Sequence, residues 1–403
     1  MGSDYLKGKG RANVTLLDVV LLLVVLVFVV SGFARGVWLT VGGAAGFAAG
    51  ATAAFFAIPL VAEWVPDPMW RIIAVIGCAV VLVVAGYSLG TAAGGEVKRI
   101  FRSPAVRTIS SLIGGVLNLF VSLAVIAALS FSVQAMGFPQ VNQHIKQSAV
   151  LQAIDSAMPE RVEALFASVR GSVVESDIPQ IAQLLVPETD EVPEADELTE
   201  AAAATSQSVG RISGVAQQCG QSQSGSGVVV APNRVATNAH VIAGVSEPSV
   251  EMPDGQVVSG RAVYFDTDKD LALLAVEGLN TPPAPVGGTM GTGEQGYVMG
   301  YPSGGPFVAG SAVVQARAES TVNNVYGSST SNLEIYQLGA DVRQGNSGGP
   351  LVDAEGNVAG IVFARALEGG EVGFALTAEA AGDALADAGS FTDGVSTGQC
   401  VDR

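Results

Sequence analysis

The chain has 403 residues, enough for two or three domains with separate cores, and its 49% hydrophobic and 14% charged residues exclude a wholly soluble protein. Residues 1–134 hold nine Lys/Arg and five Asp/Glu, a net charge of +4, whereas the remainder holds 11 and 32, a net charge of −21. This division predicts a basic membrane domain followed by an acidic soluble part, and the acidic balance argues against nucleic-acid binding.

Four apolar segments fill the first third, and each is long enough to cross a hydrocarbon core of ~30 Å. They comprise residues 16–33, 37–62, 72–93 and 109–134. Four such segments exclude a signal peptide, which offers one short apolar core. The second carries Gly42, Gly46 and Gly50, a ladder that lets helix backbones pack closely in lipid. We predict a four-helix transmembrane domain over residues 1–134.

Charges in the short connections orient this domain. The connection between the third and fourth segments carries the basic residues Lys98, Arg99, Arg102 and Arg107. Because positive loops stay in the cytoplasm, the domain after residue 134 is predicted to face outward. The basic residues of the N-terminal 11 positions would then also lie outside, against the rule. The predicted orientation therefore follows the side of the membrane that holds more of the basic residues.

An acidic residue heads the first apolar segment. Asp18 lies near its start. An intramembrane carboxylate can mark a polar pathway, but this one is close to the interface and is expected to cap the helix or reach toward the interface. The motif Gly32-x-x-Arg35-Gly36 follows at the end of the segment. In these features the first third resembles the colicin V production protein (CvpA) family of small four-span membrane proteins. The resemblance implies membrane integration and says little about chemistry.

Residues 135–207 are predicted to form a helical and acidic connector. Apolar residues recur at helical spacing over residues 150–166, which indicates one or two amphipathic helices. Residues 187–200 hold seven acidic side chains, two prolines and no aromatic residue, so they predict an exposed linker. Linkers of this kind are where proteolytic nicking concentrates.

From residue 208 to residue 403 the pattern changes to short β-type runs separated by Gly, Pro, Asn and Asp. Residues 227–230 and 358–363 are examples. Evenly spaced short strands indicate an all-β barrel or sandwich.

Three residues of this β-rich part suit nucleophilic catalysis. Ser347 lies in Gly345-Asn346-Ser347-Gly348-Gly349-Pro350, where flanking glycines allow a tight turn and leave backbone N–H groups accessible. A serine hydroxyl needs an imidazole to take its proton, and His240 is the one histidine after residue 207. Asp270 directly precedes an apolar strand, where its carboxylate can orient that imidazole. A single histidine does not make a zinc site, so no metal or other cofactor is predicted.

The order His240, Asp270, Ser347 is that of the chymotrypsin-like serine proteases. This order, together with Thr237-Asn238-Ala239 before the histidine, makes residues 208–403 resemble that family. The resemblance implies an all-β chymotrypsin-like double β-barrel with His240 as general base, Asp270 as orienting group and Ser347 as nucleophile. The backbone N–H groups of Gly345 and Ser347 would form the oxyanion hole.

Asn346 departs from the trypsin-type pattern, in which an aspartate precedes the serine. Activation by a new N-terminal amine is therefore not expected. The sequence Gly-Asn-Ser-Gly-Gly is typical of bacterial HtrA-like proteases, although no PDZ domain is expected after the last strands. Asp341 lies six residues before Ser347, the spacing at which trypsin-like enzymes place the acidic residue of the specificity pocket. The alternative is that Asp341 is an aspartate of a surface turn.

Cys219 and Cys400 lie near the two ends of the β-rich part. Two thiols that frame a domain suggest a disulfide clasp and an oxidising compartment, and two unpaired cysteines are the alternative. Cys78 lies in an apolar segment and is expected to be an inert thiol.

Four spans, an acidic connector and a protease framed by cysteines together resemble the MarP-type membrane-anchored serine proteases of actinobacteria. The resemblance implies a membrane-tethered extracytoplasmic serine endopeptidase that cleaves envelope proteins, serves acid and oxidative stress resistance, and cleaves itself in the connector. Membrane lipid and envelope proteins are the expected partners. The alternative hypothesis is a non-enzymatic membrane scaffold or secretion component with a partner-binding β-domain.

Overall fold

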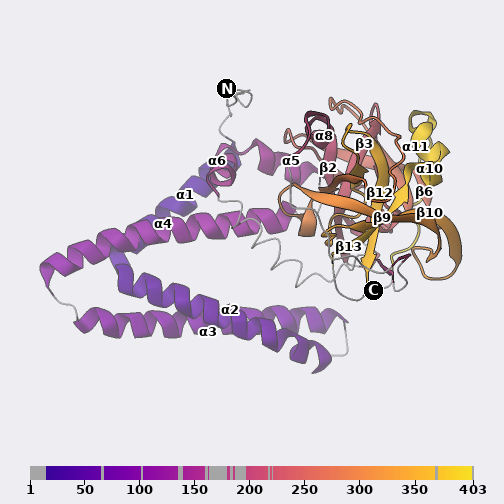
Figure 1. Ribbon diagram of the computed structural model, residues 1–403. Coiled ribbons are helices and arrows are strands. Elements are labelled where there is room, and N and C mark those ends of the chain that lie inside the picture. Colours follow the sequence, from indigo (N-terminus) through magenta and orange to yellow (C-terminus); the bar gives the residue numbers. More distant parts are fainter. Residues whose placement is uncertain are drawn as a thin grey trace. The chain divides into compact units, whose positions relative to one another are not determined.

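The computed structural model describes residues 15–64, 68–100, 103–134, 139–158, 162, 179–181, 185–186, 197–216, 218–219, 221–367 and 371–401. The chain forms two compact units (Figure 1). One contains Met1–Leu129 and Ser148–Ser156, and the other contains Ser130–Gln147 and Ala157–Arg403. Long helices make up the first unit, and strands are the main regular structure of the second.

Four long helices form the first unit: α1 (Leu16–Arg35), α2 (Val37–Trp64), α3 (Pro68–Ile100) and α4 (Pro104–Gln134). Each contains a stretch long and apolar enough to cross a membrane, which confirms the predicted four-helix transmembrane domain. All four run further than the predicted segments, α3 and α4 by the most. Lys98 and Arg99 therefore lie on the last turn of α3, and Arg107 lies on α4, rather than in a loop. Arg102 lies outside the described residues.

Glycines decide how α2 and α3 pack side by side (Figure 1). The ladder on α2 meets a second ladder on α3, composed of Gly86, Gly90 and Gly94. A Cβ on Gly46 would lie 2.1 Å from the Gly86 carbonyl oxygen, and a Cβ on Gly90 would lie 2.1 Å from that of Gly42. No larger side chain fits there, so the backbones are in direct contact. The glycine ladder predicted from the sequence is the α2 half of this interface.

Asp18 caps two helices of the first unit. Its Oδ2 accepts a hydrogen bond from the Thr15 N–H (2.7 Å), which completes a capping box at the start of α1. Its Oδ1 accepts bonds from the Ser148 hydroxyl (2.5 Å) and the Val150 N–H (2.9 Å) at the start of α6 (Ala149–Ala157). The capping role expected for Asp18 is confirmed, and it extends to a helix of the connector.

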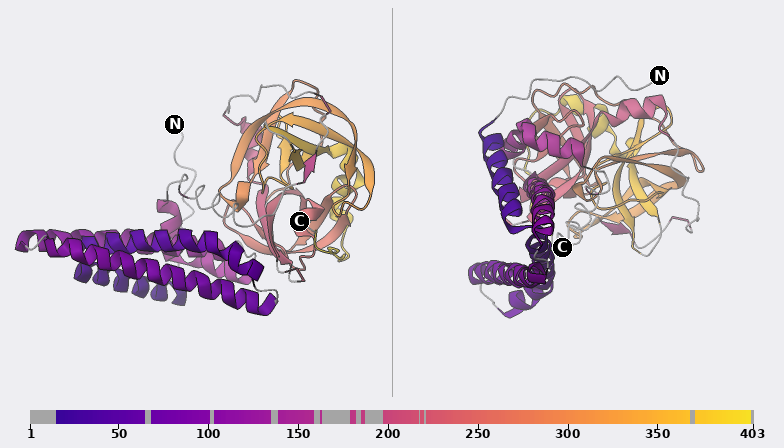
Figure 2. Two further views of the ribbon diagram at one scale, coloured as in Figure 1. Left: turned by 90° about the horizontal axis from the view of Figure 1, so that it is seen from below. Right: turned by 90° about the vertical axis from the view of Figure 1, so that its left-hand side faces the viewer.

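The second unit contains two barrels, shown in Figure 2 in pink and in orange to yellow. The first barrel is closed in the order β2-β3-β4-β7-β6-β5. Its strands are β2 (Val209–Ala216), β3 (Gln221–Ala231), β4 (Arg234–Thr237), β5 (Ser249–Glu251), β6 (Val257–Asp266) and β7 (Leu271–Val276).

The second barrel has the strand order β12-β11-β8-β9-β10-β13 and closes because β12 also pairs with β13. Its strands are β8 (Gln295–Gly300), β9 (Val308–Asn323), β10 (Thr330–Gly339), β11 (Pro350–Val352), β12 (Val358–Ala366) and β13 (Val372–Thr377), and β1 (Gln180–Ile181) is added outside β12. The prediction of a chymotrypsin-like double barrel is confirmed.

Short helices complete the second unit. They are α5 (Pro139–Gln147), α8 (Glu200–Ser206), α9 (Ala239–Ile242), α10 (Ala378–Ala381), α11 (Asp383–Ala386) and the 3₁₀ turns η1 (Pro302–Gly304) and η2 (Ala388–Ser390). One buried apolar cluster crosses from the first barrel, with Val228 and Leu273, to the second, with Met299 and Ile361. The acidic linker predicted for residues 187–200 lies outside the described residues up to position 196.

A buried carboxylate fixes α5 to the first barrel. The Glu251 side chain is 13% exposed, and its Oε1 lies 2.6 Å from the Lys146 ammonium on α5. Its Oε2 pairs with the Arg211 guanidinium on β2. Burial alone would raise the pKa of Glu251, but the two cations outweigh it and lower the pKa to about 2.

We predict that this ion-paired cluster makes stability depend on acid. The folded-state pKa of Glu251 lies below the usual value of 4.5, so its contribution is complete above that value and is lost as the pH falls toward about 2. The loss should be at most about 3.5 kcal/mol, since one pKa unit corresponds to about 1.4 kcal/mol. Calorimetry of the full chain should show that the transition temperature of Glu251→Gln falls less than that of the parent as the pH is lowered from 4.5 to about 2.

The exposed Glu277→Gln is the matched control, because Glu277 lies outside the cluster. It should retain the parent's acid dependence. Equal acid sensitivity of Glu251→Gln and the parent would contradict the prediction.

Candidate active site

Ser347 lies on a tight turn between β10 and β11 that only glycines can form. Gly345 has φ +94° and Gly348 has φ +82°, in the left-handed region. A Cβ on Gly345 would lie 2.3 Å from the Tyr301 carbonyl oxygen, and one on Gly348 would lie 2.2 Å from that of Ser226. The backbone therefore approaches its neighbours more closely than any side chain permits.

Strand β3 of the first barrel holds this turn of the second barrel. The Ser226 N–H donates to the Ser347 carbonyl oxygen (2.8 Å), and the Ser226 hydroxyl donates to that of Gly345 (2.6 Å). The same hydroxyl accepts a bond from the Tyr301 N–H (2.9 Å). Ser226 is fully buried and was not singled out in the sequence. Its flanking glycines, Gly225 and Gly227, were the available signal, since glycine within a strand marks close backbone approach.

His240 and Asp270 are joined by two hydrogen bonds. The His240 ring Nδ1 donates to Asp270 Oδ2 (2.6 Å), and the His240 backbone N–H donates to Oδ1 (2.9 Å). His240 is 6% exposed and Asp270 is 7% exposed. Because a carboxylate can only accept, Nδ1 carries the proton and Nε2 is left able to accept one.

Asn238 fixes the backbone of Asp270. The Asn238 side-chain amide donates to the Asp270 carbonyl oxygen (2.8 Å), and Asp270 has φ +50°. A left-handed conformation at a non-glycine residue is unfavourable and persists only where neighbours hold it. The sequence motif contained Asn238 but indicated no role for it.

The Ser347 turn lies beside the residues that precede His240. A Cβ on Gly348 would lie 2.3 Å from the Thr237 hydroxyl and 3.1 Å from the Asn238 nitrogen. Among the described contacts, the Ser347 hydroxyl has no hydrogen bond to His240, as is common before substrate binds. Within the same part of the chain, no protein acceptor takes the N–H groups of Gly345 and Ser347.

Asn346 and Asp341 have local partners. The Asn346 side chain accepts a bond from the Arg343 N–H (3.1 Å), so it braces its own turn. The Asp341 carboxylate is exposed and pairs with the Arg343 guanidinium (3.0 and 2.5 Å). A specificity role for Asp341 stays a prediction, because this carboxylate already has a cation on its own loop.

Cys219 and Cys400 form a disulfide, with Cα atoms 6.5 Å apart. The C-terminal tail that it holds also binds the turn after α9, the helix that carries His240. The Gly244 N–H donates to the Thr397 carbonyl oxygen (3.1 Å), and the Thr397 hydroxyl donates to that of Val245 (3.0 Å). The disulfide therefore secures a segment that binds the turn after the helix of His240.

We predict that Cys400→Ser destabilises the second unit by about 2–5 kcal/mol, because the crosslink closes a long loop. Amide hydrogen exchange at Gly244 and Val245 should accelerate. Reductant should reproduce the effect in the parent and add nothing in the variant. Cys78→Ser is the matched control and should behave as the parent; unchanged exchange in Cys400→Ser would contradict the prediction.

The sequence and the coordinates are similar to those of known proteases. Residues 225–361 match the model of the trypsin-like peptidase domain, and residues 17–159 match that of the colicin V production protein. The serine proteases MT3772 and Rv3671c of Mycobacterium tuberculosis are each 32% identical over 392 residues, 96% of this chain and 98% of the relative. The crystal structure of the active form of the Rv3671c protease is 36% identical, with a TM-score of 0.48, covering 55% of this chain and 100% of that chain.

Proposed function

Because this chain belongs to the Rv3671c (MarP) family of serine proteases, we propose that His240, Asp270 and Ser347 perform its peptide-bond hydrolysis. The family relationship runs along the membrane helices as well as the barrels, so the chain is a serine endopeptidase with a membrane domain. The observation that carries the proposed roles is the doubly hydrogen-bonded pair of His240 and Asp270.

The proposed reaction is acyl transfer in two halves. The Ser347 hydroxyl attacks the scissile carbonyl while His240 Nε2 takes its proton, and Asp270 holds the imidazole and stabilises its charged form. The N–H groups of Gly345 and Ser347 stabilise the oxyanion of the tetrahedral intermediate. His240 then protonates the leaving amine, and water releases the acyl group by the same route.

The proposed setting is the outer side of the cytoplasmic membrane. A disulfide persists in an oxidising compartment, which supports an extracytoplasmic location for the barrels. We propose that residues 1–134 anchor the enzyme, that residues 135–207 connect it and contain a self-cleavage site, and that residues 208–403 cleave envelope proteins during acid and oxidative stress. The scaffold hypothesis is set aside, since the relatives along the whole chain are serine proteases.

Ser347→Ala tests the proposed nucleophile. We expect casein hydrolysis by the purified full chain to fall by about five to six orders of magnitude in kcat, because the variant retains only oxyanion stabilisation and binding. Covalent labelling by a fluorophosphonate should disappear as well. Ser390→Ala, on an exposed turn, is the matched control and should keep both signals. Parent-like hydrolysis by Ser347→Ala would refute the assignment.

A further inference from the structure

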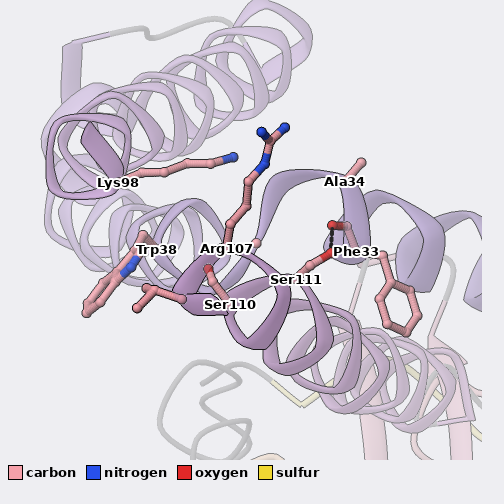
Figure 3. A pocket seen from close by; sticks show the side chains of 9 residues that line it. Phe33, Ala34, Trp38, Lys98, Arg107, Ser110 and Ser111 are labelled. Atoms are coloured by element: carbon pink, nitrogen blue, oxygen red, sulfur yellow. Dashed lines mark hydrogen bonds between the residues drawn. The ribbon is translucent and has the colours of Figure 1, made fainter. Parts of the chain in front are cut away.

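The membrane unit contains a cavity of about 460 Å³ where α1 and α3 end and α2 and α4 begin. Figure 3 shows the side chains of Lys98, from α3, and Arg107, from α4, extending into it. Ser110 and Ser111 of α4 line its wall. The cavity therefore combines two cations with hydroxyl groups.

The positive charge of this cavity is not neutralised within the described part of the chain. Lys98 donates one hydrogen bond to the Arg35 carbonyl oxygen (2.8 Å) at the end of α1. No described carboxylate forms an ion pair with Lys98 or Arg107. Glu96, the nearest acidic residue in sequence to Lys98, pairs with Arg99 (2.7 Å).

The start of α2 adds to the positive potential. Gly36 has φ +80° and ends α1, so that α2 begins at Val37. The Val37 N–H donates to the Ser110 hydroxyl (3.1 Å), and Trp38 on the same first turn lines the cavity. The first N–H groups of a long helix carry a partial positive charge that favours anions.

We propose that this cavity binds a phosphate group, carried by an anionic phospholipid or present as free phosphate. Four helices, each long enough to span a membrane, have an end at this cavity. The ends of membrane-spanning helices lie at the depth of the lipid headgroups. Basic pockets between membrane helices bind such headgroups through charge-assisted hydrogen bonds.

Native mass spectrometry of the full chain in neutral detergent tests the proposal. Dioleoylphosphatidylglycerol should bind, and dioleoylglycerol, which lacks phosphate, should not. The double substitution Lys98→Gln with Arg107→Gln should weaken phosphatidylglycerol binding about tenfold or more. Arg107→Lys, which keeps the charge, should retain most of the affinity. Helical circular dichroism identifies any variant that fails to fold.

Arg99→Gln is the matched control, because Arg99 neighbours Lys98 but does not line the cavity. It should bind as the parent does. Displacement of the lipid by inorganic phosphate identifies a site for free phosphate, and its failure to displace identifies a lipid site. Equal losses in Arg99→Gln and the double variant, or no loss in the double variant, would overturn the proposal.

A separate observation concerns β12, next to the Ser347 turn. Val362 exchanges two hydrogen bonds with this turn, to Gly348 (2.8 Å) and Gly349 (2.9 Å). Further along, Arg365 N–H donates to the Pro179 carbonyl oxygen (3.1 Å), and Leu367 N–H donates to that of Ile181 (3.0 Å). A bulge between Val362 and Ala364 in the pairing with β13 turns these donors to the edge that faces β1.

A buried glutamine holds the same connector segment. Gln337 on β10 is 0% exposed, and its Oε1 accepts a bond from the Leu185 N–H (2.7 Å) while its Nε2 donates to the Val186 carbonyl oxygen (3.0 Å). Ile181 and Leu185 pack against the apolar cluster shared by the two barrels. Burying an amide is favourable only when it is hydrogen-bonded, so this contact is specific.

We infer that Pro179–Ile181 inhibits the protease by occupying the edge on which an extended peptide would pair to reach Ser347. The inference rests on the proposed function of Ser347. A peptide substrate binds a sheet edge through main-chain hydrogen bonds, and one N–H cannot serve two strands fully. Displacement of the segment therefore exposes the donors of Arg365 and Leu367.

Gln337→Met tests this inference, because it removes the amide and keeps the volume. Casein hydrolysis by the full chain should rise several-fold, and hydrogen exchange at Ile181 and Leu185 should accelerate. Fluorophosphonate labelling, which needs no strand pairing, should keep the parent's rate. Asn332→Ala, exposed on the same strand, is the matched control. Accelerated exchange without faster hydrolysis would overturn the inhibition, and a lack of labelling in the parent would overturn the proposed function instead.

Discussion

The contact between Ser226 and the Ser347 turn is the constraint on which the candidate site depends. Ser226 belongs to the first barrel and binds the turn of the second through both its backbone and its hydroxyl. His240 and Asp270 belong to the first barrel: His240 lies on α9, just after β4, and Asp270 directly precedes β7. Because the site combines residues of both barrels, the position of one barrel relative to the other must be fixed at this contact. The apolar cluster shared by the two barrels stabilises that arrangement through its buried apolar surface.

Two buried carboxylates anchor consecutive helices of the connector to different units. Glu251 holds α5 through Lys146, and Asp18 holds α6 through the Ser148 hydroxyl and the Val150 N–H. The chain passes from one unit to the other between these helices. A charged group that is buried must be fully paired, so each anchor is specific, and each is sensitive to substitution of its partners.

The membrane helices and the Ser347 turn were predictable from sequence for different reasons. Membrane spans follow from length and hydropathy, because lipid imposes one solution on an apolar segment. The nucleophile turn was predictable because few residue types tolerate its backbone, as Gly345 and Gly348 illustrate. The extents of α3 and α4 were underestimated, because polar turns can continue a helix beyond the apolar core, and hydropathy marks only that core.

The sequence by itself determined the four spans, the β-rich class of residues 208–403 and the candidate residues His240, Asp270 and Ser347, since each depends on local composition or on the order of motifs. The double barrel was expected only from the resemblance to chymotrypsin-like proteases. The tertiary structure alone decided the roles of Ser226, Asn238 and Gln337. These polar residues have no distinctive local pattern, and their partners lie on other segments of the chain. A hydrogen bond between distant segments is a property of the fold, so it becomes visible only when the barrels bring both atoms together.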